Sequence, residues 1–225
     1  MNTLKAREFS GHSTQKDEEL NLTRKKVLLV AASALSLTII ATTFHHFSLP
    51  PFKKKGAIRA EEVCDSLGGK TDAVSTLKAI LPDKASYSFN DSTTDPRIGE
   101  RDDSYASSCF VSGDGEQLLS ARAEMLEYRE TDSWVREAVE QFAPRASLES
   151  FPAGDKAVAS SKVSAIYVPC TSHGVNRHLS VIVRLKQHGE ADPSELRQHL
   201  IVLTKEAASR SHEAAHCDAP SRVSS

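Results

Sequence analysis

The sequence has none of several short motifs that mark familiar catalytic and ligand-binding sites. It contains no G-x-S-x-G turn, no glycine-rich phosphate loop and no calcium-binding loop. These absences leave cytosolic nucleotide-dependent reactions without support, and no cofactor is predicted. No two cysteines have the Cys-x-x-Cys spacing that is typical of structural zinc sites.

The chain also lacks an excess of positive charge. It has 28 Lys and Arg residues against 30 Asp and Glu residues, and the first 44 residues hold six of the bases and four of the acids, so 22 bases and 26 acids remain. A nucleic-acid-binding domain needs a basic face or stripe, and the sequence therefore predicts no nucleic-acid partner. We interpret the basic cluster from Lys53 to Lys55 as a contact with lipid headgroups or a spacer at a membrane surface.

Only one long apolar run occurs, from Val27 to Phe44, and it contains no charged residue. At about 1.5 Å per residue a helix of this length nearly crosses a bilayer core, and Phe47 can extend it. We therefore predict a transmembrane helix over 25–47, a tail over 1–24 and a proline-containing stalk over 48–57. A cleaved signal peptide is disfavoured by the long segment before the run and by the lack of a small-x-small site after it. A buried core helix is disfavoured because the run has no polar face.

The flanks and the cysteines together predict the orientation of this helix. Six basic residues precede the run and four follow it within the near flank, which favours a cytoplasmic N-terminus. No cysteine precedes the run, and an even number follow it: Cys64, Cys109, Cys170 and Cys217. Cysteines confined to one side of a membrane indicate disulfides in an oxidising compartment. We expect a single-pass cell-membrane protein whose C-terminal domain lies outside the cytoplasm.

Residues 58–218 are predicted to form one α+β domain of antiparallel hairpins packed against helices, followed by a disordered tail over 219–225. Apolar residues at helical spacing, with caps or prolines at the ends, predict helices over 60–67, 74–81, 132–142 and 192–217. Alternating apolar residues predict strands over 85–89, 105–111, 119–125, 163–168 and 179–185. The polar segments 90–104 and 144–162 are expected to be loops.

The spacing of the cysteines favours one disulfide pairing. Cys64 precedes Cys109 by 45 residues and Cys170 precedes Cys217 by 47, and each half contains a hairpin and a helix. This parallel favours the bonds Cys64–Cys109 and Cys170–Cys217. Four cysteines allow three pairings, and the other two stay open at this stage.

Residues 212–216 read His-Glu-Ala-Ala-His, which matches the H-E-x-x-H motif of zinc hydrolases. In a zinc hydrolase, His212 and His216 would bind the metal and Glu213 would activate water. A helical wheel places both histidines opposite the apolar stripe, and no third ligand follows, so we predict no catalytic or metal site here. A serine-type hydrolase is suggested only by Ser75-x-x-Lys78, whose companion motifs are missing. The scattered histidines, His178 among them, are expected on the surface.

The layout resembles that of uncharacterised membrane-anchored extracytoplasmic proteins of actinomycetes. The residues that carry this resemblance are Val168-Pro169-Cys170, the segment Ala214 to Cys217, and the hydrophobic hairpin strand between them. The resemblance covers about residues 58–217 and implies a bacterial cell-envelope setting. Those proteins have no assigned activity, so it implies no site residues.

These observations lead to an expected function. We predict a non-catalytic binding or interaction module of the cell envelope, which contacts the lipid bilayer through residues 25–47 and binds an envelope partner that the sequence does not name. An envelope hydrolase, either zinc-dependent or of the serine type, is the alternative.

Overall fold

The structure is a computed structural model that describes residues 55–94, 105–172 and 175–223. The predicted cytoplasmic tail (1–24), the membrane helix (25–47) and most of the stalk (48–57) lie outside these ranges. Within them, no helix has the length and apolarity needed to cross a membrane. The described residues belong to one unit that begins at Lys55.

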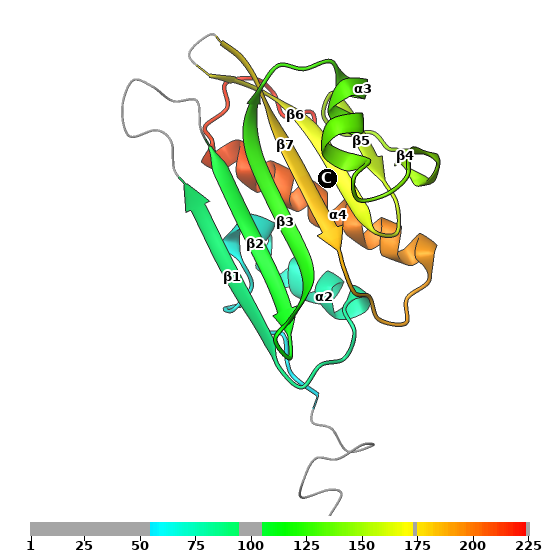
Figure 1. Ribbon diagram of the computed structural model, residues 1–225. Coiled ribbons are helices and arrows are strands. Elements are labelled where there is room, and N and C mark those ends of the chain that lie inside the picture. Colours follow the sequence, from blue (N-terminus) through cyan, green and yellow to red (C-terminus); the bar gives the residue numbers. More distant parts are fainter. Residues whose placement is uncertain (1–54, 95–104, 173–174, 224–225) are drawn as a thin grey trace, which may run out of the picture. The chain divides into compact units, whose positions relative to one another are not determined.

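The described residues form a seven-stranded antiparallel sheet with the order β1-β2-β3-β7-β6-β5-β4 (Figure 1). Its strands are β1 (Tyr87–Thr94), β2 (Ala106–Gly113), β3 (Glu116–Glu127), β4 (Glu149–Ser150), β5 (Lys156–Ala159), β6 (Val163–Ser172) and β7 (Val175–Leu185). Strands β2 and β3 meet at Asp114 and Gly115, whose φ angles of 51° and 82° suit a tight hairpin turn. The predicted α+β class with antiparallel hairpins is confirmed.

Helices cover the two faces of the sheet unequally. Helices α2 (Lys70–Ile80) and α4 (Pro193–Ala214) lie on one face, while α3 (Thr131–Trp134) and the π-helical turn η2 (Val135–Val139) that continues it lie on the other (Figure 1). Short 3₁₀ turns occur at η1 (Asp65–Leu67) and η3 (Arg145–Ser147).

Helix α4 is the main cover of the sheet because its apolar residues recur on one side. Leu196, Leu200 and Leu203 are almost wholly buried against β6 and β7 and against α2. Burying one such side chain contributes about 1.5 to 3 kcal/mol. At the start of α4, the Asp192 carboxylate accepts hydrogen bonds from the backbone amides of Ser194 and Glu195, as the capping pattern predicts.

All four cysteines form disulfides, and the bonds are Cys64–Cys109 and Cys170–Cys217. The pairing that the spacing favours is therefore confirmed. The first bond fixes η1 to β2 in the core, and the second fixes the end of α4 to β6. Two disulfides of this kind indicate an oxidising, extracytoplasmic environment for the domain.

The predicted helix over 60–67 is wrong, because only Asp65–Leu67 form a short 3₁₀ turn. Cys64 precedes this turn and is tied to β2, and the amide of Asp65 and the hydroxyl of Ser66 both donate to the Asp91 carboxylate. These contacts with the sheet leave the segment no room to continue as an α-helix.

The strand predictions are wrong at the two edges of the sheet. Strand β1 continues to Thr94 through the segment 90–94, which was expected to be a loop, and its polar residues pair with β2 while remaining exposed. Strands β4 and β5 fall within the expected loop 144–162. Ala157 to Ala159 are buried against both layers and show no alternation. Edge strands and doubly covered strands both lack the period-two pattern on which sequence prediction depends.

The segment 219–223, which the sequence analysis assigns to a disordered tail, packs against the domain. The amide of Gly154 donates to the Arg222 carbonyl at 3.0 Å, and the Arg222 guanidinium donates to the Asp155 carboxylate at 2.6 Å. Asp155 also bonds the ring of His178, which is 2% exposed rather than on the surface as expected. His178 is buried because it stacks on Tyr167, with ring centroids 4.3 Å apart.

Candidate functional site

Among the described residues, one face of the sheet is open over β1, β2 and most of β3, because α3 and η2 cover β5, β6, part of β7 and Leu126 at the end of β3 (Figure 1). The sequence of β3 builds this face through its alternation. Ala121 and Ala123 point into the core towards α4, whereas Ser120, Arg122 and Glu124 point to the open side. We call this surface the open face.

The covering segment forms a wall along the open face, and Trp134 anchors it. The Trp134 side chain is 1% exposed, its Nε1–H donates to Ser180 Oγ at 2.9 Å, and its ring stacks on that of Tyr167 with centroids 4.9 Å apart. Val139 is buried beside it. Phe142, just after η2, therefore projects over the sheet from a fixed position.

A cavity of about 430 Å³ lies between this wall and the open face. Its floor is Ser120, Leu126 and Ile182, which are partly buried. The rest of its lining is mostly aromatic, amide and charged, with one alanine and one serine: Phe110, Gln117, Arg122, Glu124, Ala138, Gln141, Phe142, Ser180, Arg184 and Lys186.

Two arginines on the open face lie against phenylalanine rings. The Arg122 guanidinium is 5.4 Å from the ring centroid of Phe110 on β2, and the Arg184 guanidinium is 4.7 Å from that of Phe142. Such stacking restrains a guanidinium while leaving its hydrogen-bonding edge available. The strand register places Arg122 opposite Ile182, so the two arginines are diagonal neighbours on β3 and β7.

Neither arginine has an acidic partner among the described residues. Most other described arginines are paired with acids, as Arg129 is with Glu137 and Arg145 with Asp132 and Glu140, whereas Arg136 bonds only the Ser133 hydroxyl. The described residues that line the cavity include Arg122, Arg184 and Lys186 against one carboxylate, Glu124. Unpaired cations on a domain with more acids than bases are suited to binding an anionic group.

A second hollow of about 400 Å³ continues the first across β1 and β2. The two share Phe110, Arg122 and Glu124, and the second adds the hydroxyl groups of Ser92, Thr94 and Ser108. Together they make an elongated depression that crosses four strands, from β7 to β1.

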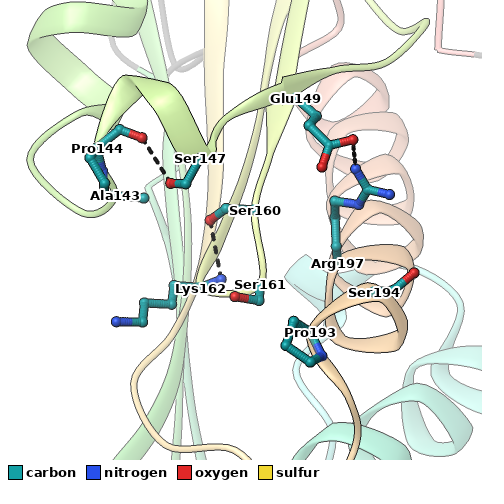
Figure 2. Close-up of a pocket in the computed structure, with 10 residues that line it drawn as sticks. All are labelled: Ala143, Pro144, Ser147, Glu149, Ser160, Ser161, Lys162, Pro193, Ser194 and Arg197. Carbon is teal, nitrogen blue, oxygen red and sulfur yellow. Dashed lines mark hydrogen bonds and ion pairs between the residues drawn. The ribbon is translucent and has the colours of Figure 1, made fainter.

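Another cavity, of about 490 Å³, lies at the start of α4 (Figure 2). Two of its charged groups are occupied, since Arg197 forms an ion pair with Glu149 on one side of the cavity. Ser160 Oγ accepts the backbone amides of Lys162 and Val163, and no histidine is among the residues that line the cavity. The first free amides of α4 are already bonded to Asp192. The arrangement offers hydroxyl groups but no activated nucleophile.

The residues of the His-Glu-Ala-Ala-His motif are not brought together as a zinc site. Helix α4 ends at Ala214, and His216 lies beyond it with a φ of 48°. His212 is partly buried rather than facing solvent as the helical wheel predicts, because the chain turns back and the Ala219 carbonyl bonds His212 Nε2 at 2.7 Å. Among the described residues, no three His, Cys, Asp or Glu side chains are grouped to hold a metal ion.

The position of His212 has a consequence for stability at mildly acidic pH. Burial lowers the pKa of its imidazole below the ordinary value of 6.5. Near and below pH 6.5 the imidazole therefore binds a proton more readily in the unfolded chain than in the folded protein. The contribution of His212 to the free energy of unfolding is fully present above pH 6.5 and is lost as the pH falls below it. We expect the melting temperature to fall between about pH 7 and pH 5.

His212→Gln removes this titration and serves as the comparison. The variant should lose less stability than the native protein over the same interval, measured by thermal unfolding at several pH values. Carboxylates whose pKa is lowered, such as Asp65 beside Lys70, lose their contribution only below about pH 4. If the melting temperatures of the two proteins fell equally steeply with pH above about pH 4, His212 would not be the group responsible.

The sequence pattern predicts no binding role for Phe110, Arg122, Phe142 or Arg184, and it predicts Phe142 only as part of an apolar helical stripe. The alternation of β3 contains a usable signal, because it predicts that Arg122 projects from the face opposite the core. Whether that face is covered depends on where α3 and η2 pack, which the pattern of β3 does not contain.

Comparison of the chain with protein-family models, with curated proteins and with solved structures gave no match.

Proposed function

We propose that this chain is a membrane-anchored, extracytoplasmic and non-catalytic binding module of the cell envelope. The uncharged run with its basic flanks supports a single span over 25–47 with the N-terminus in the cytoplasm. The disulfides support a location of the domain on the oxidising side. In this arrangement the domain stands outside the membrane and engages its partner through the open face.

The observation that carries this proposal is the pair of phenylalanine-stacked arginines beside an elongated depression. Arg122 and Arg184 are held in place, have no acidic partner among the described residues, and flank a floor with apolar character. A rigid sheet and a wall anchored by Trp134 fix this arrangement before any ligand arrives. Such preorganisation lowers the entropic cost of binding.

Enzymatic alternatives receive no comparable support. His212 and His216 do not share a helical face, and none of the serine hydroxyls that line the cavity at the start of α4 is hydrogen-bonded to a histidine, lysine or carboxylate side chain. The zinc and serine versions of a hydrolase thus have no specific geometric observation in their favour.

Site-specific photo-crosslinking in intact cells tests the proposal. Benzoylphenylalanine in place of the exposed Glu124 puts the probe on the open face, and the same group in place of the exposed Ser209 on α4 puts it on the opposite side of the sheet. We expect discrete adducts from position 124 that are absent from position 209. Equal labelling from both positions, or no adduct from position 124, would refute the open face as the binding surface.

A further inference from the structure

We infer that the open face binds an extended, acidic peptide segment of a partner polypeptide, whose carboxylates pair with Arg122 and Arg184. This inference rests on the proposed binding function and adds the chemical class of the ligand. It depends on three properties of the face: its charge, its length and its partly apolar floor.

The positive charges on the open face favour an anionic ligand. A guanidinium stacked on an aromatic ring presents a planar edge with paired donors, which matches a carboxylate in a two-bond arrangement. Arg122 and Arg184 both have this geometry, and they lean towards opposite sides of the depression, one onto β2 and the other onto the wall. Lys186 adds a third positive charge, although its ammonium group also donates to Gln117.

The length of the depression favours an elongated ligand over a compact one. The two hollows extend over β1, β2, β3 and β7, and adjacent strands are about 4.8 Å apart, so the depression is about 14 Å long. An extended peptide advances about 3.3 Å per residue, and the depression therefore holds four or five residues. A small dicarboxylate would occupy only part of it.

The lining favours a peptide over a phosphate polymer. Leu126 and Ile182 add partly buried apolar surface to the lining, and Phe110 and Phe142 line the depression beside the two cations. A phosphate chain has no group that gains from this surface, whereas a peptide can place apolar side chains between its acidic ones. The amide groups of Gln117 and Gln141 at the rim can satisfy peptide carbonyls and amides.

Glu124 places a negative charge on the same surface as the arginines. It is exposed beside Arg122 and belongs to both hollows, without an ion-pair partner among the described residues. A carboxylate here repels an acidic ligand, so its removal should strengthen binding.

Fluorescence anisotropy with the full-length, detergent-solubilised protein tests the inference. The probe is a fluorescein-labelled peptide of alternating glutamate and valine, and its glutamine–valine counterpart is the uncharged control. We expect binding of the acidic peptide only. Arg122→Gln and Arg184→Gln should each weaken it by about tenfold, because each removes a charge-assisted contact. Glu124→Gln should strengthen it by about threefold.

Arg136→Gln is the matched control, because Arg136 is exposed on η2, outside both hollows, and the substitution changes the charge equally. It should leave binding unchanged. All variants alter exposed or partly buried side chains, and circular dichroism verifies that each is folded.

Several outcomes would overturn the inference. Equal binding of the two peptides, or an equal loss with Arg136→Gln, would remove the role of Arg122 and Arg184 in recognising carboxylates. Tighter competition by inorganic polyphosphate than by the acidic peptide would assign the site to a phosphate polymer instead. If the peptide fails while position 124 still forms crosslinks in cells, the ligand class is wrong and the binding function stands. If both experiments fail, the proposed function is wrong as well.

Discussion

The double substitution Cys170→Ser/Cys217→Ser is expected to lower the free energy of unfolding by about 4 kcal/mol. The disulfide closes a long loop and so reduces the conformational entropy of the unfolded chain. The two cysteines are separated by 47 residues, and the cysteines of the other bond by 45. Urea titration of the full-length protein, followed by circular dichroism, measures the loss. The double variant at Cys64 and Cys109 should lose a similar amount.

The Cys170–Cys217 bond also holds the segment that follows α4 against β6. The amide of Asp218, next to Cys217, donates to the Thr171 carbonyl, next to Cys170. We therefore expect the segment 219–223 to detach first in the variant, as increased protease cleavage after α4. Non-reducing mass mapping that finds four free thiols in protein from intact cells would contradict both the bonds and the extracytoplasmic location.

Trp134→Ala is expected to destabilise the protein by about 4 kcal/mol, since a large buried side chain is removed and a cavity is left. The side chain is 1% exposed and stacks on Tyr167, which in turn stacks on His178. The substitution also leaves Ser180 Oγ without its donor. Because Trp134 anchors the wall that carries Phe142, the affinity of the open face should fall with it.

Trp134→Phe separates packing from hydrogen bonding. It keeps an aromatic ring against Tyr167 but loses the donor to Ser180, and we expect a loss of about 1 to 2 kcal/mol. Both variants are measured by urea titration with circular dichroism, because Trp134 is the only tryptophan and its fluorescence is lost. A loss below about 1 kcal/mol for Trp134→Ala would contradict its role as the anchor of the wall.

The parts of the fold that the sequence predicts well are those with a strong local pattern. Helix α4 combines a capping residue, a proline in its first turn and an apolar stripe that includes Leu200 and Leu203. Strands β3 and β7 each have one face in the core, so Ala121 and Leu179 alternate with polar residues. Such patterns arise when burial is one-sided.

Other parts depend on tertiary contacts that no local pattern records. The segment before Leu67 is held by Cys109 and Asp91, both distant in sequence, and forms only a short 3₁₀ turn. His212 becomes partly buried because residues beyond the helix fold back over it.

The candidate site belongs to this second group. Arg122 and Phe110 lie on adjacent strands, and Arg184 meets Phe142 only because the wall packs beside β7. The outward direction of each arginine could be predicted from its strand. Their joint position along one uncovered depression required the sheet order and the placement of α3 and η2.

The central claim, that the arginines of the open face hold an envelope partner, is tested most directly by crosslinking from position 124 in intact cells. The measurement compares the native arginines with the Arg122→Gln/Arg184→Gln double variant, at matched protein levels and with Arg136→Gln as control. The adduct yield should fall at least tenfold in the double variant and stay constant in the control. An unchanged yield in the double variant would contradict the claim.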